Sequence, residues 1–252
     1  MAQVLANRIT PPGTETRDCP VRLGFLRSAG QEPSPAARIL LTGGAQSDVR
    51  FKLYLALLWG SPAEPHGTDH RRSDWARLLS LPKYSTSGVR RISTALNWLD
   101  ENSFLSRSDR AGSASEITVL SELGTGQTYT KPSENVTRGG QPTYCRLQAH
   151  FFTNGWFAAL PGRAVLFWLI LMSETNDGKA KPFGVWLSQR RTKETFSISN
   201  HVRQSAMLDL KNAGLITYRQ IHRREAFQSM TSRTQITLRI DQLAQRADDT
   251  AS

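Results

Sequence analysis

Two stretches of the chain share one pattern of apolar and polar positions. Each opens on a strongly apolar segment, residues 51–59 in the first stretch and 162–172 in the second. A loop and a short polar segment follow, and then a longer segment whose apolar residues recur every three or four positions. Because that spacing gathers the apolar side chains on one face of a helix, we predict three helices in each stretch. The two stretches span residues 45–122 and 143–241.

The second and third predicted helices repeat along the chain. The second helix is expected at residues 74–79 in one stretch and at 188–195 in the other. The third helices align at an offset of 111 residues, so that ALNWLDENSFLS corresponds to AMLDLKNAGLIT. Gly214 is placed to end the later helix in a left-handed turn, because glycine adopts positive φ freely. Ser103 stands at the equivalent position of the earlier helix, where we expect a different cap.

Two β-prone runs follow each third helix. SFLSRS and EITVLSE flank the polar loop DRAGSAS in the first stretch, and LITYRQIH and RTQITLRI flank RREAFQSMTS in the second. Residues 234–240 alternate well, with Ile236, Leu238 and Ile240 on one face and Gln235, Thr237 and Arg239 on the other, as in a half-buried strand. Each stretch is therefore predicted to end in a β-hairpin.

The remaining segments contain residues that interrupt helices. Residues 1–44 carry prolines at positions 11, 12, 20, 33 and 35, which predict a flexible N-terminal arm. Within that arm, RILLT at residues 38–42 is compatible with an edge strand or a helical turn. Residues 123–142 are rich in Gly, Thr and Pro and predict a linker between the two stretches. Residues 242–252 form a polar tail that is expected to begin as a helix and then fray.

The order helix, helix–turn–helix and two-stranded hairpin resembles the winged-helix (winged helix-turn-helix) DNA-binding superfamily. The closest likeness lies in FSISNHVRQSAMLDLKNAGLITYRQ, which resembles the turn, the recognition helix and the first wing strand. FFTNGWFAALPGRAVLFWLILM resembles the opening of winged-helix proteins from actinobacterial genomes and mobile elements, and the tandem layout is similar to that of plasmid replication initiators. The resemblance implies an α+β, mainly α fold with two tandem winged-helix domains at 45–122 and 143–241.

The charge of the chain favours a polyanionic partner. The formal net charge is +11 and the sequence pI is about 10.2, which suits nucleic acid or an anionic membrane face. Residues 183–239 hold ten basic and three acidic residues, a net charge of +7, whereas residues 48–121 hold ten and eight, a net charge of +2. We therefore expect the second module to bind phosphate more strongly. The first module is expected to read sequence or to mediate dimerisation.

A winged helix places its third helix in the major groove and its wing on phosphate or in the minor groove, so outward polar residues on these elements are the candidate DNA contacts. In the second module Arg203 lies at the margin of the helix and could face either way, and Ser199 is placed to cap it. The candidates there are Arg190, Arg191, Ser199, Asn200, His201, Arg203, Gln204, Arg219, Arg223, Arg224 and Arg233. In the first module they are Arg90, Arg91, Ser93, Thr94, Asn97, Arg107 and Arg110.

No motif argues for an enzyme, a cofactor or a metal. The chain lacks a phosphate-binding GxxxxGK[ST] loop, a GxGxxG turn, an HExxH pair and a GxSxG elbow. His66, Asp69 and His70 form an HGTDH cluster, but it lies in a Pro/Gly-rich segment that reads as a solvent loop. The six tryptophans fall mostly within apolar runs, which favours core packing over base stacking.

The expected location is cytoplasmic and nucleoid-associated. Cys19 and Cys145 fall in the predicted arm and at a domain edge, and their spacing argues against a disulfide framework. The longest apolar run, residues 164–172, is shorter than the roughly 20 residues of a membrane span. The N-terminus lacks the apolar core of a secretory signal.

Three functions are compatible with these patterns. The first is a sequence-specific transcriptional regulator that acts by occupying an operator on double-stranded DNA. The second is a replication initiator of a plasmid or other mobile element that binds repeats at an origin, since tandem winged helices let one chain span two successive major grooves. The third is a partitioning or architectural DNA-binding protein with little sequence preference. A second copy of the chain, in a homodimer, is considered as a further partner, and no membrane partner is expected.

Overall fold

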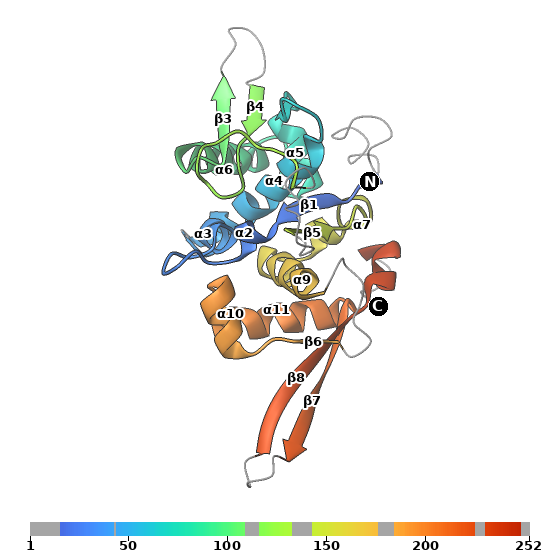
Figure 1. Cartoon of the computed structure of the whole chain (residues 1–252). Coiled ribbons are helices and arrows are strands. Elements are labelled where there is room, and N and C mark those ends of the chain that lie inside the picture. The colour runs from blue at the N-terminus through green and yellow to red at the C-terminus, as the bar shows by residue number, and fades with distance from the viewer. Residues whose placement is uncertain are drawn as a thin grey trace.

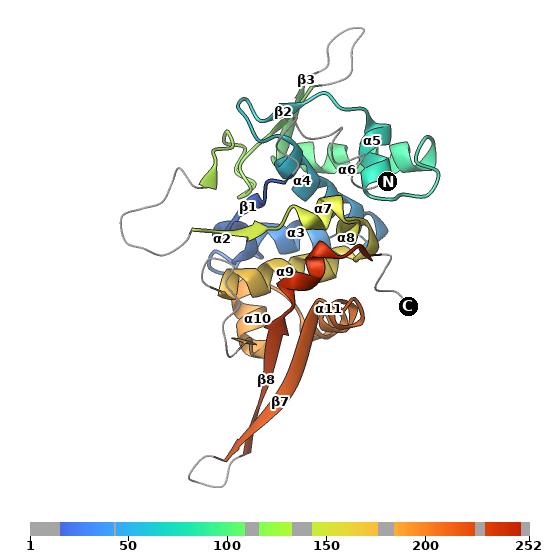
Figure 2. The same ribbon diagram turned by 90° about the vertical axis from the view of Figure 1, so that its right-hand side faces the viewer.

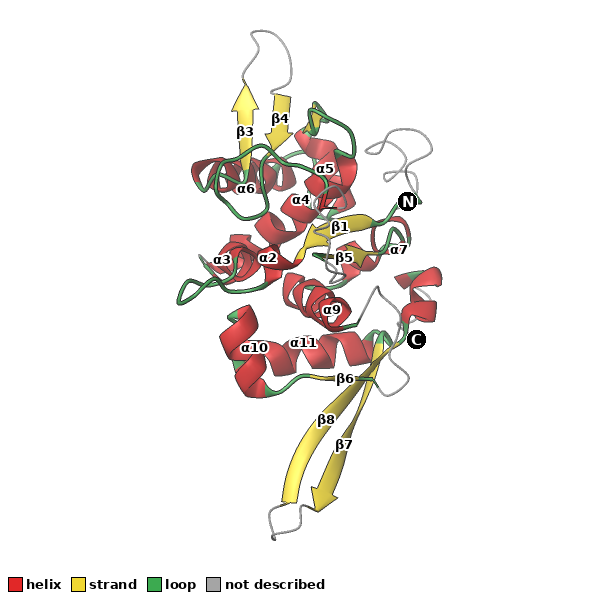
Figure 3. Cartoon of the chain, viewed as in Figure 1, coloured by secondary structure: helices red, strands yellow, loops and turns green. Residues whose placement is uncertain are grey.

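The protein is a mixed α/β fold with small antiparallel sheets, in which about half of the described residues are helical. The computed structural model describes residues 16–42, 44–108, 116–132, 143–175, 184–224 and 230–247. Figure 1 shows two halves that meet at central helices, with a β-hairpin extending from each far end. Figure 3 shows the same layout by element type, with most of the helices between the two hairpins.

The centre of the fold is built from α4 (Ser47–Gly60) and α9 (Gly162–Glu174). Both helices are apolar around nearly their whole circumference, and nearly every residue of each is buried. A helix of that kind requires neighbours on all sides. α4 contacts α3, α6, α9 and β1, so that one continuous apolar core passes through both halves.

The predicted helices and hairpin of the first stretch are confirmed. After α4 the chain forms β2 (Gly67–Thr68), α5 (Arg72–Leu78), α6 (Ser87–Glu101), β3 (Leu105–Ser108) and β4 (Glu116–Val119). The three strands form one antiparallel sheet in the order β2-β4-β3. Strand β2 was not predicted, because two residues are too few to show an alternating pattern.

The second stretch repeats this order of elements. After α9 come β6 (Val185–Trp186), α10 (Gln189–Phe196), α11 (Asn200–Asn212), β7 (Ile216–Arg224) and β8 (Met230–Leu238). The sheet order is β6-β8-β7, which is equivalent to β2-β4-β3. The hairpin is longer than predicted, since its register runs from Ile216–Leu238 to Arg224–Met230. Gln235, expected on the solvent face, is buried, and its side-chain oxygen accepts from the Arg219 guanidinium.

Backbone hydrogen bonds repeat at the 111-residue offset. Phe104 N donates to Leu99 O, and Leu215 N donates to Leu210 O, both at 2.9 Å. Gly214 ends α11 at a φ of 71°, as predicted. Ser103 adopts the same left-handed conformation at φ 63°. The expectation of a different cap in the first half was therefore wrong: backbone geometry imposed by the repeat outweighs the cost of a Cβ at positive φ.

The prediction of a flexible N-terminal arm is wrong from Cys19 onward. Residues 19–41 form β1 (Cys19–Arg22), α2 (Leu23–Leu26) and α3 (Pro35–Leu41), and most of their apolar side chains are buried. β1 pairs with β5 (Tyr144–Leu147) and joins the N-terminal segment to the second half. Pro35 is accommodated because it occupies the first turn of α3, where a missing N–H costs nothing. Residues 1–15 lie outside the described residues.

The predicted linker and tail are also partly packed. Tyr129 is buried against the ring of His66, while residues 133–142 lie outside the described part of the chain. The tail begins as a 3₁₀ helix, Ile240–Ala244, beside α7 (His150–Thr153) and α8 (Trp156–Ala159). The Trp156 indole donates to Leu243 O at 3.2 Å. A buried indole N–H needs a hydrogen-bond acceptor, and a backbone carbonyl of the tail supplies it.

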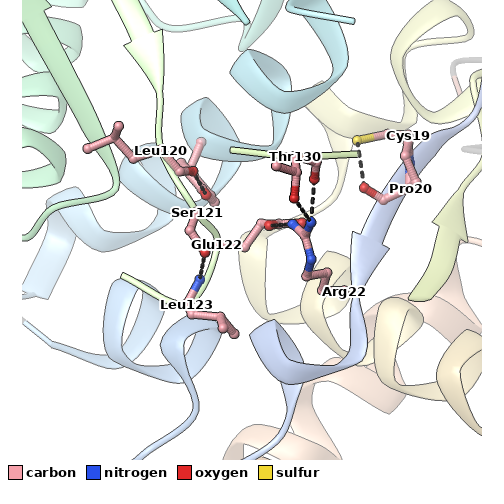
Figure 4. A network of polar contacts seen from close by, with 9 residues as sticks. Cys19, Pro20, Arg22, Leu120, Ser121, Glu122, Leu123 and Thr130 are labelled. Atoms are coloured by element: carbon pink, nitrogen blue, oxygen red, sulfur yellow. Dashed lines mark hydrogen bonds and ion pairs between the residues drawn. The ribbon is translucent and has the colours of Figure 1, made fainter. Parts of the chain in front are cut away.

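A buried ion pair lies where the N-terminal strand meets the end of the first half (Figure 4). The Arg22 guanidinium pairs with the Glu122 carboxylate, whose side chain is fully buried, and also donates to Thr130 Oγ1 at 2.8 Å. Burial raises the pKa of Glu122 above its ordinary value, although Arg22 opposes that shift. The carboxylate is therefore held in an environment that favours its neutral form.

Glu122→Gln is expected to gain stability relative to the wild type as the pH rises. A carboxyl whose pKa is raised on folding contributes stability that is present below its ordinary pKa of 4.5 and is lost as the pH passes the raised value. Glutamine stays neutral throughout. Both proteins are unfolded in urea at a series of pH values from 4 to 8. The unfolding free energy of the variant minus that of the wild type should become more positive as the pH rises. A shift toward the wild type would mean that Arg22 stabilises the carboxylate by more than burial costs it.

Candidate nucleic-acid interface

Side-chain caps fix the two helices that carry most of the candidate contacts of the second stretch. Ser188 Oγ accepts from Arg191 N at 3.1 Å and caps α10, and Ser199 Oγ accepts from Val202 N at 3.3 Å and caps α11. The predicted role of Ser199 as a cap is confirmed. Between the helices Ser197 takes a φ of 58°, which reverses the chain within a few residues.

The outer face of α11 is polar with one apolar exception. His201 and Gln204 are exposed and Asn200 is half-exposed, whereas Ala206 and Leu210 are buried as the periodicity predicted. Leu208 is 53% exposed and lies one turn beyond Gln204 on the same face. The sequence interpretation missed it, although its spacing of four from Gln204 placed it outside the apolar stripe.

Arg203, which the sequence left free to face either way, lies on the buried side of α11 and not on this face. The residue is 8% exposed, and its guanidinium donates to Leu187 O at 3.3 Å. It also reaches the Asn200 side-chain oxygen, and burial lowers its pKa. Arg203 precedes Ala206 by three positions and Leu210 by seven, so it lies on the buried side of the helix. Its long apolar stem allows a charged residue to lie there.

The two arginines of α10 are exposed and already paired. Arg190 Nε lies 3.0 Å from Glu194 one turn along the same helix. Arg191 reaches from α10 to Glu174 at the end of α9 at 2.8 Å. The side chains of Arg190 and Arg191 are 85% and 52% exposed. The Arg190–Glu194 pair is exposed on both sides and contributes little to stability, so a phosphate can replace that carboxylate at small cost. Glu174, the partner of Arg191, is only 12% exposed.

The hairpin β7–β8 extends away from the body of the protein in Figures 1 and 2. Arg219 is exposed on it and donates to Gln235 at 2.7 Å. Trp186 of β6 is 41% exposed and is aligned with Gln235 in the sheet register. The sequence interpretation assigned it to no surface. The backbones of three further candidates, Arg223, Arg224 and Arg233, lie in β7 and β8, and their side chains lie outside what is described.

The equivalent face of the first half is largely occupied by internal contacts. Arg107 donates to Asp100 at 2.9 Å and to Asn97 at 2.8 Å. Arg91 donates to Gln46 at 3.4 Å, and Ser93 accepts from Arg72 at 3.2 Å. Arg90 and Thr94 are exposed, and the Thr94 hydroxyl donates to Arg90 O. Arg110 lies outside the described residues. The structure thus brings these candidates together on and beside α6, but several of them bind one another.

The HGTDH segment was expected to be a solvent loop, but its first histidine is buried. His66 is 1% exposed and its Nδ1 lies 3.0 Å from Ser61 O, which ties the segment to the end of α4. Among the described residues no three His, Cys, Asp or Glu side chains gather as a metal site would require.

Cys19 and Cys145 are buried free thiols on the paired strands β1 and β5. Burial raises the pKa of Cys145 to about 12.

The prediction of tryptophans in the core is confirmed for four of them. Trp59, Trp75, Trp156 and Trp168 are buried, and Trp59 stacks on Phe152 with ring centroids 4.3 Å apart.

Within the described residues no helix is both long and apolar enough to cross a membrane. No model of a known protein family matches the sequence, and no curated protein matches it.

Proposed function

We propose that this chain binds double-stranded DNA through two tandem winged-helix units and acts as a sequence-specific transcriptional regulator that occupies an operator. The observation that carries the proposal is the repeated order of helix, strand, two helices and hairpin, with an exposed polar face on the last helix of the second unit. Winged helices present that helix to the major groove. The net charge of +11 favours a polyanionic partner.

In this proposal α11 enters the major groove and α10 contacts the backbone. Gln204 and Asn200 can pair with the edge of adenine, and Leu208 suits the methyl group of thymine. Arg190 and Arg191 exchange their carboxylates for phosphates, which positions the helix without reading sequence. Arg219 on the hairpin adds a further backbone contact.

The two units contribute unequally. Among the described residues, His201 and Gln204 of α11 are exposed and are not bonded to each other, whereas Arg107 of β3 donates to Asn97 of α6. The net charge of the first unit is also smaller. We assign the main phosphate binding to the second unit, and to the first unit a weaker DNA contact or a dimer contact.

Gln204→Ala is expected to change which sequence the protein prefers, because a bidentate contact to a base discriminates by about 1–3 kcal/mol. Selection from a pool of random duplexes should show relaxed preference at one position of the site. Gln245→Ala, the same change at an exposed position of the tail, serves as the control and should keep the wild-type profile. A wild-type profile for Gln204→Ala would place α11 outside the groove.

A replication initiator is the second candidate. One apolar core joins the two units, and α4 packs directly on α9, so the two recognition helices are held in a fixed relation, as a protein spanning successive grooves requires. Footprinting separates the two functions. A site that overlaps a promoter supports the regulator, whereas a series of repeated sites at a replication origin supports the initiator.

A further inference from the structure

A segment of the first half contacts the turn between α10 and α11. Residues 27–34, which we call the connecting segment, join α2 to α3. Ser28 N donates to Thr195 O at 2.8 Å, and the hydroxyls of Ser28 and Ser197 are hydrogen bonded to each other. The turn of the second half is therefore held by a segment that lies about 170 residues earlier in the chain.

Ser34 makes the second set of contacts. Its backbone N donates to Ser197 Oγ at 3.1 Å, and its hydroxyl donates to Phe196 O at 3.2 Å. The same hydroxyl accepts from Ala37 N and caps α3. Ser34 is fully buried, so these bonds are shielded from water and are costly to break. One side chain thus links the start of α3 to the end of α10.

Ser197 is the centre of these contacts. Its φ of 58° is one that side chains other than glycine and asparagine seldom adopt. A glycine would form this turn with less strain but without the hydroxyl that binds Ser28 and Ser34. The hydroxyl therefore gives the turn partners that the backbone alone does not supply.

An ion pair accompanies the hydrogen bonds. Glu174 at the end of α9 lies 2.8 Å from Arg191 of α10 and 3.9 Å from Arg27 of the connecting segment. The carboxylate is 12% exposed. If Arg191 exchanges Glu174 for a phosphate, Arg27 remains beside the carboxylate and compensates its charge.

We propose that the connecting segment is a positioning element that sets the orientation of α10 and α11 and thereby the DNA affinity of the second unit. The inference rests on the proposed DNA-binding function. Ser28, Ser34 and Ser197 are positioning residues, since they act through α11 and not on DNA. The connecting segment leads through α3 to α4, so this contact couples the first unit to the recognition helix of the second.

The test compares Ser197→Gly and Ser28→Ala with two controls. Ser197→Gly removes the hydroxyl while favouring the observed φ, so global stability should change little. Ser28→Thr keeps a hydroxyl and serves as the conservative rescue. Ser47→Ala removes a hydroxyl that donates to Gly44 O within its own turn. The readouts are amide exchange of residues 196–202 without DNA, the thermal midpoint, and the Kd for a selected duplex at fixed salt.

Ser197→Gly should speed exchange at the turn and weaken duplex binding roughly three- to tenfold, with a smaller loss for Ser28→Ala. Ser28→Thr and Ser47→Ala should bind within about twofold of the wild type. Wild-type binding and exchange in Ser197→Gly would overturn the positioning role alone. A wild-type protein that binds no duplex would overturn the proposed function and, with it, this inference. A loss of affinity that merely follows a lowered thermal midpoint would also overturn it.

Discussion

Arg22→Ala is expected to destabilise the fold by about 3–5 kcal/mol, since removing one partner of a buried ion pair leaves the other charge uncompensated. Glu122 is fully buried, and Arg22 is its only cationic partner among the ion pairs of the described residues. The same guanidinium holds Thr130 and lies over the ring of Tyr129. Its loss therefore also loosens the segment that packs β1 against the first half. Urea unfolding at pH 7 measures the effect.

The double variant Arg22→Ala with Glu122→Gln is the matched control. It removes the stranded charge and should recover a substantial part of the loss, because an uncharged amide costs less to bury than a carboxylate. The single variant should also become less destabilised at acid pH, where Glu122 is protonated. If the single and double variants unfold alike at pH 7, the cost comes from lost packing and not from the buried charge.

Arg190→Ala combined with Arg191→Ala is expected to weaken binding to all duplexes alike. Each phosphate contact contributes about one unit to the slope of log K against log salt, so the slope should fall by roughly 2. Affinity at low salt should fall accordingly, and sequence preference should persist. Fluorescence anisotropy of a labelled duplex across a range of salt concentrations measures both quantities.

The control for this pair is Arg239→Ala with Arg246→Ala. That variant removes the same formal charge from exposed arginines near the C-terminal 3₁₀ helix. Its slope should stay close to that of the wild type. Equal slopes for both double variants and the wild type would remove α10 from the interface, and equal losses in both would indicate a response to net charge alone.

The helices and hairpins were predictable because local pattern determines them. α4 and α9 each contain a long apolar run, and the apolar stripe of α6 and the alternation in β8 follow the periods of a helix and a strand. The N-terminal segment was not predictable in this way. Its burial depends on pairing of β1 with β5, more than 100 residues away, and a count of prolines carries no information on such a contact.

The candidate site was predictable in outline but not in detail. Spacing correctly placed Gln204 and His201 outside and Ala206 and Leu210 inside. It left Arg203 ambiguous, because an arginine at the margin of a stripe is buried only when a carbonyl such as Leu187 O lies within reach. The contacts of Ser28 and Ser34 with the turn join distant segments, so only the folded structure reveals them.

The proposed binding of duplex DNA has the second unit as its main contact. A hydroxyl-radical footprint of the intact protein on a selected duplex tests it most directly. We predict a discrete protected site that weakens steeply with added salt and loses its strongest protection in Arg190→Ala with Arg191→Ala. Absence of protection at low salt, or protection that this variant leaves unchanged, would contradict the claim.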